Sequence, residues 1–158
     1  MKEYVYRYAT YKKVGYNIMR AEENYNKLSK KEKAKIEKAI EKFFKKQEDV
    51  DAYIIFGSFV NRNYFRDIDI AIISKKRISD LKVEKIGSEL ELKIKIPVDI
   101  HIFSRLPLKL KYQALKTGKP VLLKNREYVL QQKLRTITEF LDFYPFLKRY
   151  TKNKIWNC

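Results

Sequence analysis

Three aspartates in two apolar segments are the residues of this chain whose types and spacing are best suited to chemistry. Asp67 and Asp69 lie in "DIDIAII", residues 67–73, and Asp99 lies in "IKIPVDIHIF", residues 94–103. The alternation of polar and apolar residues predicts β-strands, whose successive side chains point to opposite faces. Asp67 and Asp69 are therefore expected on one face, about 7 Å apart along the strand. The isoleucines that alternate with them are expected on the other face.

Ionised carboxylates that face an apolar interior are unfavourable unless they are paired or bind a cation. Two on one strand face, with Asp99 on a candidate neighbouring strand, predict a divalent cation, and Mg²⁺ suits a site of few carboxylates, waters and substrate phosphates. A strand whose polar face meets solvent is the alternative for an isolated Asp-x-Asp pair. His101 shares the expected face of Asp99, close enough to touch substrate or metal, although a single strand histidine is more often structural.

Gly57 and Ser58 supply a candidate phosphate site. They follow "AYIIF", residues 52–56, which is typical of a buried strand. Glycine at a strand end lets the backbone approach a ligand closely, and the free N–H groups of a helix that begins there can bind a phosphate together with the serine hydroxyl. Ten residues before an Asp-x-Asp strand, this dipeptide favours a polyphosphate substrate beside the metal.

Two helices are expected around these strands. Residues 29–46 predict an amphipathic helix with Ser29 as its N-cap and Glu32 three residues later, the spacing of a capping box. Residues 79–94 predict a second helix, which connects two strands. Its expected apolar side consists of Leu81, Val83, Ile86 and Leu90.

The C-terminal part of the chain predicts a helix, a short strand and a long helix. The first helix, "LPLKLKYQALKTGKP", is expected to end at a C-cap formed by Gly118. A short strand, "VLL", follows at residues 121–123. The last helix is expected from Glu127 to about Tyr150, with a kink or a division at Pro145.

Size and composition favour one compact domain. The chain has 158 residues, 45% of them hydrophobic, which is enough for one core and short for two. We expect an arm and amphipathic helix in residues 1–48, the core in residues 49–124 and a helical segment in residues 125–158.

The one cysteine is Cys158, so no internal disulfide is expected. With no membrane span or signal peptide evident, we expect a cytoplasmic protein.

The net charge of +17 is concentrated in the two ends of the chain. Residues 49–104 carry nine cationic and nine acidic residues, whereas residues 1–48 carry 14 and seven and residues 105–158 carry 13 and three. Such flanks favour polyanionic partners such as nucleic acid, although a solvated surface has the same composition. The tyrosines near the N-terminus, among them Tyr4, Tyr6 and Tyr8, could stack on bases or pack against protein.

The order of these features resembles the DNA polymerase β-type nucleotidyltransferase superfamily, and most of all its minimal nucleotidyltransferase (MNT) branch. The shared features are an apolar strand, Gly57-Ser58, a loop, Asp67-x-Asp69, a helix and a strand with Asp99. The resemblance implies an α+β fold: a small mixed sheet backed by helices, with N- and C-terminal helical extensions. It also implies two Mg²⁺ ions held by the three aspartates, ATP as substrate, and Gly57 and Ser58 around the outgoing phosphates.

The loop between the glycine and the aspartates departs from the family pattern. Members usually have an Arg-Gly pair soon after Gly-Ser and a serine before the first aspartate, whereas this chain has "FVNRNYFR", residues 59–66. Arg62 is expected to replace the usual arginine. Arg66 is expected either to bind a phosphate or to pair with Asp67.

The resemblance implies transfer of AMP, or another nucleoside monophosphate, to a hydroxyl group. The acceptor expected for the antitoxin-type members is a tyrosine of a partner HEPN toxin. Transfer to an RNA 3′ end is the alternative that the positive charge favours, and a non-catalytic toxin- or RNA-binding module is the alternative that the altered loop favours. A homo- or hetero-oligomer is compatible with each of these functions.

Overall fold

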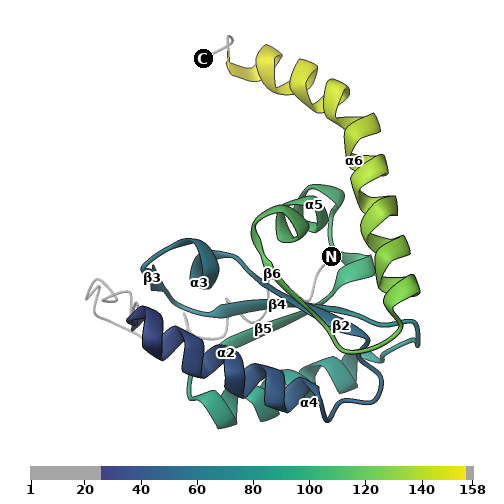
Figure 1. Cartoon of the computed structure of the whole chain (residues 1–158). Helices are drawn as coiled ribbons and strands as arrows, with labels where there is room; N and C mark the ends of the chain where they lie inside the picture. Colours follow the sequence, from purple (N-terminus) through teal and green to yellow (C-terminus); the bar gives the residue numbers. More distant parts are fainter. Residues whose placement is uncertain (1–25, 156–158) are drawn as a thin grey trace, which may run out of the picture.

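The structure, a computed structural model, describes residues 26–155 of the chain (Figure 1). The Tyr-rich segment before residue 26 and Cys158 lie outside the described residues, so the interpretations given for them stay predictions. A four-stranded sheet forms the centre of the fold. Its strands are β2 (Ala52–Phe56), β4 (Ile68–Ile73), β5 (Val98–Ile102) and β6 (Lys119–Leu122). A separate pair consists of β1 (Asn26–Lys27) and β3 (Tyr64–Phe65).

The central sheet is mixed, with strand order β5-β4-β2-β6. β2 runs antiparallel to both β4 and β6, whereas β4 and β5 run parallel. Parallel neighbours need a crossover connection, and α4 (Asp80–Ile94) supplies it. The expected α+β class with a small mixed sheet is therefore confirmed.

Helices cover both faces of the sheet, as Figure 1 shows. α2 (Lys30–Phe44) and α4 lie on one face, and α5 (Leu108–Thr117) and the first part of α6 (Arg126–Ile155) lie on the other. Ile68, Ile70 and Ile72 are buried under α2 and α4, which confirms the alternation predicted for this strand. The second core cluster, on the other face, consists of Ala52, Ile54, Phe56, Ala71, Ile73, Phe103 and Ala114.

The capping box predicted for α2 is present. The backbone N–H of Glu32 donates to Ser29 Oγ at 3.3 Å, and the backbone N–H of Ser29 donates to Glu32 Oε2 at 2.8 Å. These two bonds satisfy donors that the first helical turn leaves without intrahelical partners. The helix then packs Ile40, Phe43 and Phe44 against the sheet.

The apolar side predicted for α4 is wrong at Leu81, whose side chain is 80% exposed. The buried residues of this helix include Ile86 and Leu90, and Val83 packs against the same core. At about 100° per residue, Leu81 lies on the opposite side of the helix from Leu90, nine residues later. The four residues therefore do not share one face.

Gly118 is the C-cap of α5, as predicted, although its backbone is extended, with φ −80°. A Cβ atom at this position would lie 2.6 Å from the Ile54 side chain, so close packing on β2 requires the glycine.

Pro145 lies inside α6, which continues through it and bends in its C-terminal half (Figure 1). Within residues 26–155, no helix has the length and apolar character that a membrane crossing requires.

Candidate active site

Strand pairing brings the predicted site residues to one end of the sheet. Phe56, the last residue of β2, pairs with Asp69 in β4, and Asp69 pairs in turn with Asp99 in β5. Gly57 follows Phe56 directly, so the turn after β2 reaches the same end of the sheet as both carboxylates. The sequence gives no pairing register, and these contacts depend on it.

Asp69, Asp99 and His101 form a group that can hold a metal ion. One ligand atom from each of the three residues lies within 4.8 Å of the others, and His101 Nε2 lies 3.9 Å from Asp69 Oδ1. No other group of this kind was found within residues 26–155. The donor set of two carboxylates and an imidazole fits a divalent cation. We therefore add His101 to the candidate site.

Asp67 lies immediately before β4, outside this group of three, and is half-buried. Burial raises the pKa of its carboxyl, and the negative charges of Asp69 and Asp99 raise the same pKa further. The positive charge of Arg66 acts in the opposite direction, with a smaller effect on the pKa of Asp67. Asp67 is therefore close enough to Asp69 and Asp99 to be repelled by their negative charges, and a cation beside the three carboxylates would relieve this repulsion.

In metal-free protein at pH 7, Asp67→Asn is expected to raise the melting temperature. The folded pKa of Asp67 lies above its ordinary value of 3.8, so the folded state holds this proton more tightly than the unfolded chain. The contribution of Asp67 to stability therefore falls as the pH rises from 3.8 to the folded pKa, and the variant does not undergo this loss.

Thermal unfolding in EDTA between pH 3 and pH 7 checks this expectation. The difference between variant and wild type should shrink toward pH 3, where the carboxyl is protonated in both states. Asp142→Asn, which changes an exposed carboxylate on α6, is the control and should show no such trend. A variant that melts below wild type at pH 7 would contradict the prediction.

Gly57 has a backbone conformation that is essentially restricted to glycine. Its φ of 76° and ψ of −152° lie in a region that side chains with a Cβ atom avoid. A Cβ atom at Gly57 would overlap Asp69 Oδ2 and lie 3.0 Å from Asp69 Cγ. The glycine therefore allows the turn to pass directly against a candidate metal ligand. Ser58, the other predicted phosphate-binding residue, is the first residue of α3 (Ser58–Asn61).

Arg62 and Arg66 are both exposed and lie on either side of β3. The backbone N–H of Arg62 donates to the Ser58 carbonyl at 2.9 Å, which closes the single turn of α3. The carbonyl of Arg66 accepts a bond from the Asn26 side chain at 3.3 Å. The structure thus places the backbones of both arginines in the loop that carries Gly57, and phosphate binding by their side chains stays a prediction.

Lys33 of α2 fixes this loop, and the sequence interpretation missed it. Its ammonium group donates to the carbonyls of Phe59 and Arg62, both at 2.6 Å, and lies 5.2 Å from the centre of the Phe59 ring. Burial, and then the charge of Lys119, lower the pKa of Lys33. In the sequence, this role of Lys33 is indicated by its position on the apolar side of the helix, three residues before Ile36 and seven before Ile40.

Lys33→Met is expected to destabilise the fold by about 1–2 kcal/mol, because two loop carbonyls lose a charged donor. For a chain of this size, the melting temperature should fall by about 2–8 °C in a thermal unfolding experiment. Lys35→Met, an exposed position on the same helix, is the matched control and should change it little. Equal effects of the two substitutions would show that the contacts of Lys33 do not stabilise the loop.

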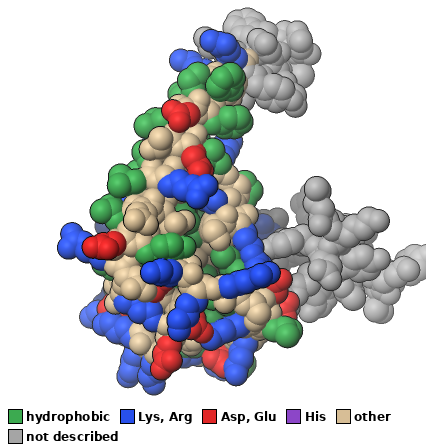
Figure 2. Space-filling view, turned by 90° about the vertical axis from the view of Figure 1, so that its right-hand side faces the viewer, with side chains coloured by type: hydrophobic (Ala, Val, Ile, Leu, Met, Phe, Trp, Pro, Cys, Tyr) green, Lys and Arg blue, Asp and Glu red, His purple; other side chains and the backbone are tan. Residues whose placement is uncertain are grey.

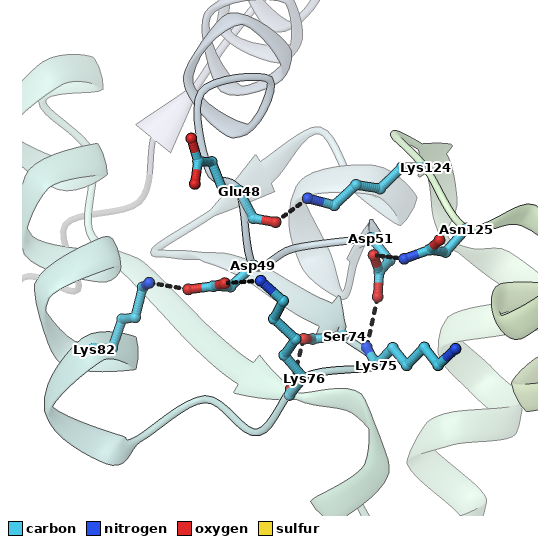
Figure 3. Close-up of polar contacts among 9 residues, drawn as sticks. All are labelled: Glu48, Asp49, Asp51, Ser74, Lys75, Lys76, Lys82, Lys124 and Asn125. Carbon is cyan, nitrogen blue, oxygen red and sulfur yellow. Dashed lines mark hydrogen bonds and ion pairs between the residues drawn. The ribbon is translucent and has the colours of Figure 1, made fainter.

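A second acidic group, at the other end of β2, has a structural role (Figure 3). Asp51 is 3% exposed, and its carboxylate accepts bonds from the Lys75 backbone N–H and, at 2.7 Å, from the Asn125 side chain. Nearby, Asp49 pairs with Lys76 and Lys82. These contacts match the negative charges with donors and tie the start of β2 to the end of β4 and the start of α6.

The sheet with carboxylates at the shared end of β4 and β5, beside a glycine turn, defines the class of protein. The sequence profile of the family described as "Polymerase beta, Nucleotidyltransferase" matches residues 38–127. The matched region spans more than half of the chain and contains every predicted site residue. The protein belongs to this nucleotidyltransferase family.

Solved chains of toxin–antitoxin structures have a similar fold. A chain of a toxin–antitoxin crystal structure with AMP-PNP is similar with a TM-score of 0.63 and 18% identity, over 75% of this chain and 98% of that one. For a chain of the toxin–antitoxin MntA-HepT, the TM-score is 0.58 and the identity is 16%, over 80% of this chain and 99% of that one. For a chain of the tri-AMPylated Shewanella oneidensis HEPN toxin in complex with MNT antitoxin, the TM-score is 0.57 and the identity is 17%, over 78% of this chain and 96% of that one. At these identities the likeness shows the fold. No curated protein matches the sequence.

Proposed function

We propose that this protein is a metal-dependent nucleotidyltransferase that transfers AMP from ATP to a hydroxyl group of a protein partner, a tyrosine of a HEPN-type toxin. The observation that carries the proposal is the arrangement of the acidic group: Asp69 and Asp99 paired across two strands, with Gly57 against Asp69. Membership of the nucleotidyltransferase family supports the reaction class. The toxin–antitoxin structures, one of them with AMP-PNP, support the nucleotide and the kind of partner.

In this proposal each site residue has a distinct role. Asp67, Asp69 and Asp99 hold divalent cations, for which the sequence predicts Mg²⁺. When bound, these ions lower the pKa of the acceptor hydroxyl and neutralise charge on the phosphates. Asp99, the most exposed of the three, accepts the proton of the acceptor hydroxyl.

The group transfer is an in-line displacement at the α-phosphorus of ATP. The acceptor oxygen forms a bond to this phosphorus, the bond to the oxygen that bridges to the β-phosphate breaks, and pyrophosphate leaves. In this proposal, backbone N–H groups of the turn at Gly57 and Ser58 bind the outgoing phosphates. Arg62 and Arg66 would add positive charge to the same loop.

The exposed surface of α6 supports a protein partner. Figure 2 shows apolar side chains along the part of α6 that projects from the sheet. Exposed apolar patches of this kind commonly mark protein interaction sites. Six large side chains of this helix are between 46% and 63% exposed: Leu130, Leu134, Leu141, Phe143, Tyr144 and Phe146.

Leu134→Glu combined with Leu141→Glu is expected to weaken partner binding by about thirtyfold, the size of a strong interface contact, because it places charges in this apolar surface. Binding of the purified partner, measured by calorimetry, checks the prediction. Leu92→Glu, a change at a 69% exposed leucine on α4, is the matched control. Unchanged affinity in the double variant would place the interface elsewhere.

Labelling with [α-³²P]ATP tests the proposed reaction. Purified protein with Mg²⁺ is expected to label a cognate HEPN-type protein, and mass spectrometry should find AMP on a tyrosine of that partner. The Asp67→Ala/Asp69→Ala variant should label nothing. A partner that is neutralised equally well by this variant without labelling would instead indicate a non-catalytic binding module.

Transfer to RNA is the second candidate, and the net charge of +17 favours it. The same labelling reaction with an RNA pool in place of the protein separates the two acceptors. Label on RNA 3′ ends, absent from the protein partner, would replace the proposed acceptor and leave the reaction class unchanged.

A further inference from the structure

We propose that His101 is a metal ligand in this protein and that it makes the site formed by Asp69, Asp99 and His101 selective for Mn²⁺ over Mg²⁺. The inference rests on the proposed function, because it concerns the metal of the same site. It goes further by assigning a nitrogen ligand to a site whose predicted ligands are carboxylates.

The strand register places His101 beside the carboxylates. His101 pairs with Ala71 in the parallel ladder, two residues after the pair of Asp69 and Asp99, so all four side chains lie on one face. The small Ala71 side chain leaves the imidazole free to extend toward Asp69. On the same face, the Phe56 ring lies 6.0 Å from the imidazole, centre to centre, and limits the positions of the histidine.

The distances suit one ion shared by the three side chains. Two atoms that bind one ion at about 2.1 Å each lie at most about 4.2 Å apart. The 3.9 Å between His101 Nε2 and Asp69 Oδ1 meets this limit. The whole group lies within 4.8 Å, so rotations that move side-chain atoms by less than about 1 Å close it around an ion. The histidine is partly buried and Asp99 is exposed, which leaves one side open to a nucleotide.

The donor atoms decide the preference between the two metals. Mg²⁺ strongly prefers oxygen ligands, whereas imidazole nitrogen raises the affinity for transition-metal ions such as Mn²⁺. Mn²⁺ also accepts the carboxylates, waters and phosphates that the rest of the site would provide. Asp67, which lies outside the group of three, remains available to a second ion that needs only oxygen ligands.

Electron paramagnetic resonance of the bound Mn²⁺ tests the ligand directly. The sequence contains one histidine, so in untagged protein an imidazole nitrogen coupled to Mn²⁺ can come only from His101. We expect the ¹⁴N coupling of a directly bound imidazole in wild type and its loss in His101→Gln with Mn²⁺ still bound. Nitrogen couplings that come from the nucleotide or the backbone remain in the variant, so its spectrum is the background to subtract from the wild-type spectrum.

Metal affinities give the second readout. Removing the histidine should weaken Mn²⁺ binding by about tenfold or more, a typical cost of disturbing a metal site. Mg²⁺ binding should change by less than about threefold, because Mg²⁺ gains little from the nitrogen. Asp99→Asn is the matched comparison and should weaken both ions.

The outcomes separate this inference from the proposed function. Bound Mn²⁺ without imidazole coupling in wild type, or equal losses for both metals in His101→Gln, would overturn the inference and leave the nucleotidyltransferase proposal intact. Absence of binding of either metal, with and without ATP, would overturn both.

Discussion

Asp69→Asn is expected to reduce nucleotidyl transfer by at least about a thousandfold, the equivalent of several kcal/mol of transition-state stabilisation. Asp69 occupies the centre of the candidate site. It pairs with Asp99, lies 3.9 Å from His101 and adjoins the backbone of Gly57. The amide keeps the size of the side chain and removes the charge that binds a cation.

Stability distinguishes this effect from a folding defect. The negative charge of Asp69 raises the pKa of Asp67, so its removal relieves repulsion, and the melting temperature of the metal-free variant should not fall. Initial rates with labelled ATP and thermal unfolding of the same samples provide the two measurements. Glu84→Gln, at an exposed site on α4, is the control for loss of a carboxylate. An Asp69→Asn variant within about tenfold of wild-type activity would exclude Asp69 from the reaction.

Gly57→Ala is expected to lower activity by about a hundredfold and to destabilise the fold by about 1–3 kcal/mol. The destabilisation arises because the backbone at φ 76° and ψ −152° is strained for alanine. The loss of activity arises because the new methyl group overlaps Asp69 Oδ2, so either the turn or the metal ligand must move.

Gly87→Ala provides the matched control for this substitution. Gly87 is buried in α4, but a Cβ atom there would lie 3.5 Å from the Ile100 side chain, an ordinary contact. Alanine is also the better helix former, by up to about 1 kcal/mol, so this variant should be active and at least as stable as wild type. Activity assays and thermal unfolding of both variants check the contrast. Equal activities and equal melting temperatures for the two variants would mean that the contact between Gly57 and Asp69 has no functional role.

Much of the local structure could be predicted because its causes lie within a few residues. Ser29 and Glu32 form their capping box through neighbouring backbone groups, and the alternation of residues 67–73 assigns each side chain to a face. The exposure of Leu81 has a local cause as well, because at about 100° per residue it lies opposite Leu90 on the helix. The angular position of Leu81 on α4 therefore identifies it as a residue of the exposed side of this helix.

The functional residues could be predicted by type, whereas the place of His101 among them could not. The sequence predicted Asp67, Asp69 and Asp99 as one metal site. The structure brings Asp69 and Asp99 together with His101 within 4.8 Å, and a metal-binding role of Asp67 stays a prediction. Lys33 was missed because its two acceptor carbonyls lie 26 and 29 residues away, at positions that no local pattern connects to it.

By itself, the sequence determined the helix caps, the faces of the strands, the acidic residues and the glycine turn. These features depend on backbone geometry and on the chemistry of single side chains. The tertiary structure alone decided that β4 and β5 pair in parallel with Asp69 opposite Asp99, which brings His101 to the carboxylates and Gly57 against one of them. The physical reason is that strand register is set by hydrogen bonds and packing between distant segments. A shift of β5 by one residue would turn Asp99 and His101 to the other face of the sheet, away from Asp69.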